Sequence, residues 1–222
     1  MSGDDIRERY LKLSTSVVSD VLDVMGLMDQ ALAASFTSMV PGGDRLAGSA
    51  YTIEGQLTSY PLTGDPEKMR AIEEMEPGCI SVWSGREVEG VCFFGELISR
   101  GMKLKGCKGA LVDGGVRDLQ PISAISFPVF ARYRTPVQSI GRWKVGAWQV
   151  PISLPGATSK SVEVQPGDFI VADHDGVLVI PASLKEVVLE RAERLTHDEE
   201  QVSGDIEKGL SLEEVLSKHG HV

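Results

Sequence analysis

The chain contains 222 residues, of which 42% are hydrophobic and 24% are charged. This composition is typical of a globular protein with one domain, or at most two small ones, and excludes a disordered chain or a disulfide-stapled mini-protein. Apolar runs are too short to span a membrane, and the acidic residues 1–5 do not resemble a secretory signal, so we expect a cytoplasmic protein without a membrane partner. The net charge of −10 argues against nucleic acid as a partner.

Hydrophobic spacing and turn residues predict the elements at the start of the chain. Apolar residues at helical spacing over 6–25 predict two short helices, and residues 46–53 are typical of a strand. A helix is expected to begin after Asp65 and to end at Pro77, because Asp is a favoured N-cap and Pro cannot continue a helix. The apolar residues 79–83 predict a second strand.

Strands and a helix then alternate. Residues 91–94 form a short apolar run, and a helix is expected to begin at Gly95 and to end near Gly106. Residues 108–112 predict a buried strand that stops at the paired glycines 114–115, where the backbone can turn sharply.

The rest of the chain has a different pattern of residue types. Residues 127–180 contain short apolar runs separated by Gly, Pro and polar residues, which predicts strands. Capping-box spacing at 183–186 and at 211–214 predicts two helix starts. The fold class is therefore α/β, with one domain over residues 1–182 and a C-terminal helical tail over residues 183–222.

An apolar stripe follows the predicted tail, formed by Leu184, Val188, Leu195, Val202 and Ile206. Such a stripe needs a surface to cover it, and a neighbouring copy of the chain could supply that surface. We therefore expect a homo-oligomer.

Arg117 and Asp118 are the most informative residues for function. They follow the predicted buried strand, and open α/β sheets bind ligands at the carboxyl ends of their strands. Arg can bind a carboxylate through two hydrogen bonds, and Asp can bind a divalent cation. Gly95 and Glu96 lie at a strand-to-helix junction, where free amides can bind an anion. A surface ion pair after a turn, and a glutamate that merely complements the helix dipole, are the alternative interpretations.

Two other groups of residues are weaker candidates. The run Asp173-His174-Asp175 contains metal-ligand types, but Asp175 with the next glycine lies between two apolar runs, and this pattern favours a hairpin. The three cysteines at positions 79, 92 and 107 are widely spaced within apolar or glycine-bounded segments, which predicts reduced core thiols.

The motifs Phe94-Gly95-Glu96-Leu97 and Val112-Asp113-Gly114-Gly115-Val116-Arg117-Asp118 resemble those of a known family. It is the 4-hydroxy-4-methyl-2-oxoglutarate/4-carboxy-4-hydroxy-2-oxoadipate aldolase family, which includes the RraA-like regulators of ribonuclease activity. Further landmarks similar to those of the family occur in the same order over nearly the whole chain, at residues 19–23, 45–50, 166–168 and 173–177.

The resemblance implies a swivelling β/β/α-type sandwich, assembled as a homotrimer or a hexamer, with an active site at the subunit interface that uses Mg²⁺ or Mn²⁺. By motif position, Asp118 would be the direct metal ligand. Arg117 would bind the carboxylate and oxo groups of the substrate, and Glu96 would hold metal-bound water.

The resemblance also assigns residues around the substrate. Gly95 and the amides of Leu97 and Ile98 would bind the pyruvyl carboxylate. Glu199 or Glu200, from the tail of a neighbouring subunit, would complete the catalytic site.

These residue types suit a class II aldolase that cleaves a 4-hydroxy-2-oxo acid, with oxaloacetate decarboxylation as a side activity. A divalent cation and an arginine can stabilise the pyruvate enolate that forms from a small anionic 2-oxo acid. A Schiff-base lysine is not expected, because every lysine lies in polar, glycine-punctuated sequence. The alternative is a non-catalytic, protein-binding regulator of ribonuclease activity on the same fold. The long tail favours the aldolase.

Overall fold

The computed structural model describes residues 3–86 and 88–220 of the chain. Within these ranges, nine strands form one sheet in the order β1-β6-β5-β3-β2-β10-β11, with β4 paired to β5 and β7 paired to β2. The strands of this sheet are β1 (Thr37–Ser38), β2 (Leu46–Leu57), β3 (Ile80–Ser84), β4 (Cys92–Phe94), β5 (Gly109–Val116), β6 (Val129–Arg134), β7 (Trp143–Trp148), β10 (Phe169–Ala172) and β11 (Val177–Ile180). A separate antiparallel pair is formed by β8 (Ile152–Pro155) and β9 (Ser161–Val164).

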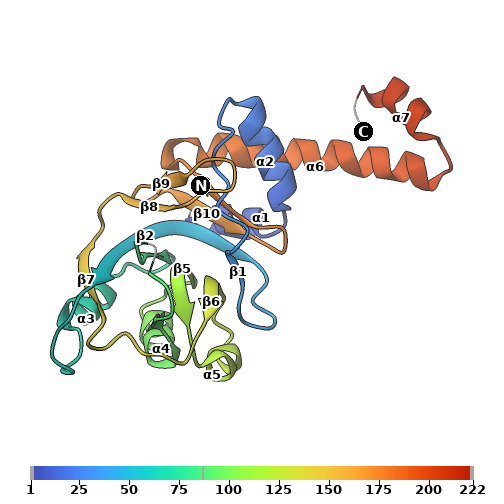
Figure 1. Cartoon of the computed structure of the whole chain (residues 1–222). Coiled ribbons are helices and arrows are strands. Elements are labelled where there is room, and N and C mark those ends of the chain that lie inside the picture. Colours follow the sequence, from blue (N-terminus) through green and yellow to red (C-terminus); the bar gives the residue numbers. More distant parts are fainter. Residues whose placement is uncertain (1–2, 87, 221–222) are drawn as a thin grey trace.

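Helices cover the sheet on two sides (Figure 1). The α-helices are α1 (Gly3–Tyr10), α2 (Thr15–Val24), α3 (Pro66–Glu73), α4 (Glu96–Leu104), α5 (Leu119–Ala124), α6 (Lys185–Glu207) and α7 (Leu212–His219), and a 3-10 turn covers Ala182–Leu184. This arrangement confirms the predicted α/β fold class with a C-terminal helical tail.

The long strand β2 joins the two parts of the sheet and curves across the molecule (Figure 1). Its beginning pairs antiparallel with β10, its middle pairs parallel with β3, and its end pairs antiparallel with β7. At Gly55 a Cβ atom would lie 2.1 Å from the ring of Trp143. The missing side chain therefore lets β7 cross β2 at the point where the pairing register shifts.

One part of the sheet consists of parallel strands connected by helices. The connections β2-α3-β3, β4-α4-β5 and β5-α5-β6 place the carboxyl ends of β4 and β5 side by side, with Phe94 paired to Val116. Trp83, Phe93 and Trp143 are buried beneath this edge, and the rings of Phe93 and Trp143 are stacked with their centroids 4.2 Å apart. A packed aromatic core thus supports the edge at which ligands are expected.

The glycine pair Gly114–Gly115 does not end a strand, so that prediction was wrong. Both residues lie inside β5. A Cβ atom on Gly114 would lie 2.3 Å from the Phe93 ring, and one on Gly115 would lie 2.7 Å from the Tyr133 ring. These glycines are needed for the close approach of neighbouring side chains, and the chain turns only after Val116.

The other part of the sheet packs against α1, α2 and α6. Asp173 joins the β10–β11 hairpin to α2, because its carboxylate accepts hydrogen bonds from the Thr15 amide at 2.8 Å and from the Thr15 hydroxyl at 2.6 Å. The hairpin predicted around Asp175 is therefore confirmed. The buried residues Cys79 and Cys107 are free core cysteines, as expected, and so is Cys92.

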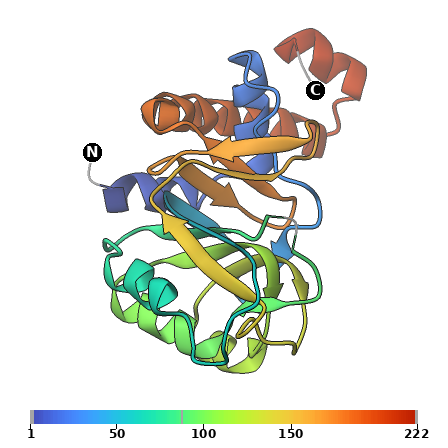
Figure 2. The same cartoon turned by 60° about the vertical axis from the view of Figure 1, so that its left-hand side comes forward.

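The tail begins against its own chain. Val188, Leu189 and Ala192 of α6 are buried in a cluster with residues of α1 and α2. The first half of the predicted stripe is thus covered without a neighbouring subunit, whereas the second half of α6 extends beyond the body and carries α7 (Figures 1 and 2). Of the stripe residues in this second half, Val202 is buried within the chain and Ile206 remains 40% exposed.

The two predicted capping boxes have different outcomes. Ser211 forms one with Glu214 at the start of α7, as expected. Ser183 lies within the 3-10 turn, and α6 begins after Leu184 without a side-chain cap, so the box at residues 183–186 was wrong. No helix in the described ranges has both the length and the apolar content to cross a membrane.

Candidate active site

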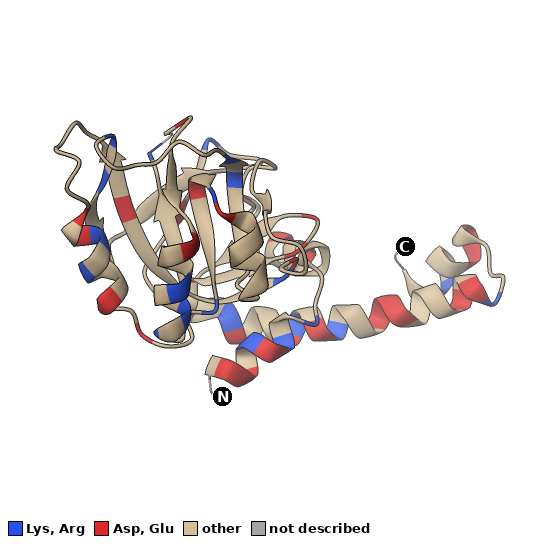
Figure 3. Ribbon diagram, turned by 90° about the horizontal axis from the view of Figure 1, so that it is seen from below, with Lys and Arg blue, Asp and Glu red and all other residues tan. Residues whose placement is uncertain are grey.

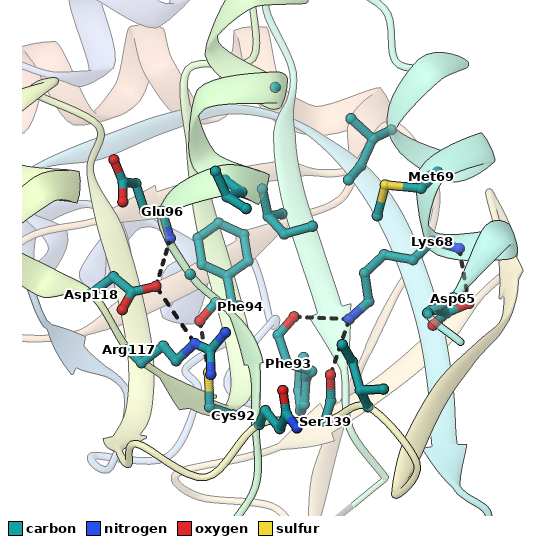
Figure 4. A pocket seen from close by; sticks show the side chains of 18 of the residues that line it. Asp65, Lys68, Met69, Cys92, Phe93, Phe94, Glu96, Arg117, Asp118 and Ser139 are labelled. Carbon is teal, nitrogen blue, oxygen red and sulfur yellow. Dashed lines mark hydrogen bonds and ion pairs between the residues drawn. The ribbon is translucent and has the colours of Figure 1, made fainter. Parts of the chain in front are cut away.

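A pocket of about 590 Å³ opens where β4 and β5 end. Its wall is formed by α3, β4, the beginning of α4, the Arg117–Asp118 pair and residues 138–140 (Figure 4). The structure therefore brings together the predicted residues Gly95, Glu96, Leu97, Ile98, Arg117 and Asp118.

The first turn of α4 presents free amides to this pocket. Gly95 is the N-cap and has no side chain, and the Glu96 amide donates a hydrogen bond to Oδ2 of Asp118 at 3.3 Å. The amides of Leu97 and Ile98 have no acceptor among the residues that the structure describes. Unpaired amides at the positive end of a helix form a site for an anion such as a carboxylate.

Asp118 is held in an uncommon backbone conformation, with φ of 61° and ψ of 41°. It is the N-cap of α5, but its side chain does not cap that helix. The carboxylate instead faces the first turn of α4 and lies 3.5 Å from Nε of Arg117 (Figure 4). Non-glycine residues in the left-handed region are concentrated at functional sites, where the surrounding structure maintains the strain.

Arg117 is anchored by its backbone and leaves its guanidinium accessible. Its amide donates a hydrogen bond to the Phe94 carbonyl at 3.1 Å, and 41% of its side chain is exposed. Apart from the contact with Asp118, the guanidinium has no partner in the described part of the chain. It is free to bind a ligand carboxylate through two parallel hydrogen bonds.

Glu96 lines the pocket but is already paired. Its Oε1 accepts a hydrogen bond from Nε of Arg100 at 2.8 Å, one turn along α4. Its expected role in holding water stays a prediction.

Glu199 and Glu200 lie far along the chain on α6 and do not line this pocket. Glu199 instead lines a groove between α2 and α6, together with Asp20 and Arg191. Acidic and basic residues alternate over the first part of α6, whereas only acidic charges of these types follow Arg194 up to the end of the helix (Figure 3). A single chain thus does not bring these glutamates to the site, and their contribution from a neighbouring subunit stays a prediction.

Lys68 is a pocket residue that the sequence reasoning missed. Its side chain is buried, and Nζ donates hydrogen bonds to the Phe93 carbonyl at 3.2 Å and to Oγ of Ser139 at 3.3 Å. Burial lowers the pKa of its amine to about 8. The expectation that no lysine is desolvated was therefore wrong. One signal was available, because Lys68 lies in the first turn of the helix capped by Asp65, where the helix dipole disfavours a cation.

The carboxylate oxygens at and near Asp118 fit a divalent cation that keeps most of its bound water molecules. Across residues 3–86 and 88–220, no group of three or more His, Cys, Asp and Glu side chains could hold a metal ion. A closed zinc-like cage is thus not formed within the described chain. Oδ1 of Asp118 has no hydrogen-bond partner among these residues, and Glu96 lies beside it in the pocket. One or two carboxylates are the protein ligands that Mg²⁺ usually takes.

Comparisons with known proteins identify the family of this chain. A family profile described as RraA-like: Aldolase/RraA matches residues 15–179. The chain belongs to the RraA-like family. A protein of Halalkalibacterium halodurans, named as a candidate 4-hydroxy-4-methyl-2-oxoglutarate aldolase, is 32% identical over 197 residues, which are 88% of this chain and 86% of that protein.

Solved structures of this fold are also similar. An uncharacterized protein from Pseudomonas syringae pv. tomato matches with a TM-score of 0.85 and 26% identity, over 98% of this chain and 95% of that one. The RNA-processing inhibitor RraA from Thermus thermophilus matches with a TM-score of 0.56 and 27% identity, over 74% of this chain and 92% of that one. Members of the RraA-like family thus carry names of two kinds, aldolase and inhibitor.

Proposed function

We propose that this protein is a divalent-metal-dependent aldolase that cleaves a 4-hydroxy-2-oxo acid and releases pyruvate, with oxaloacetate decarboxylation as a side activity. The observation that carries the proposal is the meeting of Arg117 and Asp118 with the free amides of Leu97 and Ile98 in one pocket. These groups match the carboxylate, the oxo group and the developing negative charge of such a substrate.

Each of these residues has a different part of the substrate to bind. In the proposed complex, the amides of Leu97 and Ile98 bind the carboxylate next to the oxo group, and the Arg117 guanidinium donates hydrogen bonds to the carboxylate and the oxo oxygen. Asp118 holds Mg²⁺ or Mn²⁺ directly, and Glu96 orients the water around it. The bound cation supplies positive charge that favours formation of an enolate.

The negative charge that develops on the substrate during the reaction explains the use of a fixed arginine. In the cleavage, the 4-hydroxyl gives its proton to water and C4 becomes the carbonyl carbon of the second product as the bond between C3 and C4 breaks. The electron pair of that bond enters the 2-oxo group and forms the enolate of pyruvate, which then takes up a proton at C3. Loss of carbon dioxide from oxaloacetate leaves the same enolate. Because Arg117 is anchored through its backbone to Phe94, its charge is in place before the reaction starts.

The proposed assembly is a homotrimer or a hexamer in which a tail reaches the pocket of a neighbouring copy. The projection of the second half of α6 from the body supports this proposal. Glu199 or Glu200 would then complete the site in trans.

Pyruvate release tests the proposal directly. The purified protein is mixed with 4-hydroxy-4-methyl-2-oxoglutarate or with oxaloacetate, in Mg²⁺, Mn²⁺ or EDTA, and pyruvate is measured with lactate dehydrogenase. Protein-free samples with the same metal correct for spontaneous decarboxylation. We expect release above this background with either metal and none with EDTA.

The inhibitor name of the Thermus thermophilus neighbour supports the second candidate, a non-catalytic regulator of RNA processing. With such a protein, pyruvate would be released no faster than in the protein-free samples. The protein would also slow the cleavage of RNA by a ribonuclease that it binds. That combination of results would contradict the proposed aldolase.

A further inference from the structure

Lys68 places a second cation in the pocket, on a different element from Arg117. It reaches the pocket from α3, whereas Arg117 follows β5 (Figure 4). Lys68 is only 6% exposed. Its Nζ contacts the Phe93 carbonyl, Oγ of Ser139 and the face of Trp143, whose ring centroid is 5.1 Å away.

These contacts pair N–H donors of the Lys68 ammonium group but do not neutralise its positive charge. In the part of the chain that the structure describes, Lys68 forms no ion pair with a carboxylate. Asp65 is the nearest acidic residue in sequence, but its Oδ1 accepts the Lys68 amide at 3.2 Å and its Oδ2 accepts the Val145 amide at 2.9 Å. Both oxygens thus serve the backbone.

Two further features disfavour an isolated ammonium at this position. Lys68 lies in the first turn of α3, at the positive end of the helix dipole. Burial and the like charge of Arg117 in the same pocket lower the pKa of Lys68, and they outweigh the opposing effects of Asp65 and Cys92. A buried cation that forms no ion pair is costly even with Asp65 nearby, so a ligand that brings a negative charge to Nζ would reduce a cost that the free protein bears.

We propose that Lys68 binds the distal carboxylate of the substrate and thereby makes this pocket select 2-oxo diacids over 2-oxo monoacids. This role rests on the proposed function, because it takes the 2-oxo carboxylate to lie at Arg117. An ammonium has three donors, and two of them contact Phe93 and Ser139, so the third is available to the ligand. Lys68 is a specificity-determining residue in this scheme.

The test compares two inert ligands that differ only at the distal end. 2-Oxoglutarate carries a distal carboxylate, 2-oxopentanoate carries a methyl group in its place, and neither has the 4-hydroxyl needed for aldol cleavage. Isothermal titration in Mg²⁺ gives both dissociation constants. We expect the unmodified protein to bind 2-oxoglutarate at least tenfold more tightly.

The Lys68→Met variant keeps the length of the side chain and removes its charge. We expect it to weaken 2-oxoglutarate binding at least tenfold and to leave 2-oxopentanoate binding within about twofold, so that the preference disappears. The matched control is Lys144→Met, because Lys144 pairs with Glu67 outside the pocket, and this variant should keep the preference. Equal weakening of both ligands, or an unchanged preference, would overturn the role of Lys68.

The pH dependence of the unmodified protein gives a second test that needs no variant. The lowered pKa of Lys68, about 8, means that the free protein loses this charge as the pH rises through that value. The uncharged groups that face Nζ are the Phe93 carbonyl, Ser139 and Trp143. Of the charged or titratable groups that act on Lys68, Asp65 and Cys92 raise its pKa and Arg117, which is charged throughout, lowers it, and burial raises the pKa of the Cys92 thiol. The preference for 2-oxoglutarate should therefore decline between pH 7 and pH 10, and a constant preference would contradict the proposal.

A Schiff base is the competing role for a buried lysine. Treatment with borohydride in the presence of pyruvate would then attach the three-carbon unit covalently to Lys68, and mass spectrometry would detect it. Such an adduct would overturn the ionic role, and its absence supports that role.

Failures of the two proposals are distinguishable. If no substrate releases pyruvate but the preference for 2-oxoglutarate depends on Lys68, the aldolase proposal fails and the binding role stands. If pyruvate is released but the Lys68→Met variant keeps the preference, only the binding role fails.

Discussion

Gly95 and Asp118 approach each other so closely that a Cβ atom on Gly95 would lie 2.9 Å from Oδ2 of Asp118. The backbone at Gly95 is extended, with φ of −166°, so any residue could adopt its conformation. A side chain at this position would therefore be accepted by the backbone but would require the Asp118 carboxylate to move. The contact joins the amide end of α4 to the acidic residue that follows β5.

The first prediction tests this contact. Gly95→Ala should displace the carboxylate of Asp118 and the side chain of Arg117, whose Cγ would lie 3.3 Å from the new atom. We expect kcat/KM for pyruvate release to fall about tenfold or more, since small displacements of catalytic groups are costly. Gly146→Ala is the control, because a Cβ atom there meets nothing within 4 Å. Equal activity of the two variants would show that the close approach does not matter.

The second prediction concerns the metal ligand. Asp118→Asn should abolish most metal-dependent pyruvate release, because a neutral amide binds Mg²⁺ weakly. The melting temperature should change little, since 41% of the Asp118 side chain is exposed. Asp44→Asn is a matched control, with a side chain that is 40% exposed and lies outside the pocket. Near-normal release by Asp118→Asn would exclude Asp118 as the direct ligand.

The third prediction concerns the shape of the arginine. Arg117→Lys retains the charge but loses the planar pair of donors, so we expect a loss of about 2 to 4 kcal/mol of transition-state stabilisation, measured as kcat/KM. Arg100→Lys, one turn into α4, should have a small effect, because an exposed ion pair contributes little. Full activity of Arg117→Lys would reduce the role of Arg117 to charge alone.

The fourth prediction tests the shared site. Sedimentation should show a trimer or a hexamer, and a double variant with Glu199→Gln and Glu200→Gln should be inactive although Arg117 and Asp118 are intact. Mixing it with the inactive Asp118→Asn protein under conditions of subunit exchange should restore part of the activity, because some interfaces then pair an intact pocket with an intact tail. An active monomer, or no recovery after exchange is demonstrated, would refute the shared site.

The fifth prediction concerns stability at a distance from the pocket. Asp173→Ala leaves the buried amide and hydroxyl of Thr15 without their acceptor, so the free energy of unfolding should fall by about 2 to 3 kcal/mol in urea titrations. His174→Ala, at a side chain that is 79% exposed, should have little effect. The Asp173→Ala variant should keep its affinity for Mg²⁺. A loss of that affinity would favour the metal-cluster interpretation of residues 173–175.

The sequence by itself determined the features that depend on neighbouring residues in the chain. The Asp65 cap, the Gly95 start of α4 and the hairpin at Asp175 follow from local backbone preferences, and the structure contains all three. Arg117 and Asp118 are neighbours because they are consecutive in the sequence. The order of strands and helices predicted that both lie at the carboxyl ends of the sheet strands. The α/β fold class and the principal pocket residues were therefore predictable.

Only the tertiary structure decided the features that depend on residues distant in the chain. Gly114 and Gly115 are typical of a turn, yet they lie inside a strand because the rings of Phe93 and Tyr133 occupy the space of their side chains. Lys68 lies in polar sequence, yet it is buried because β4 and residues 138–140 close over α3. Burial is the sum of contacts from separate segments, so no local pattern of residue types encodes it.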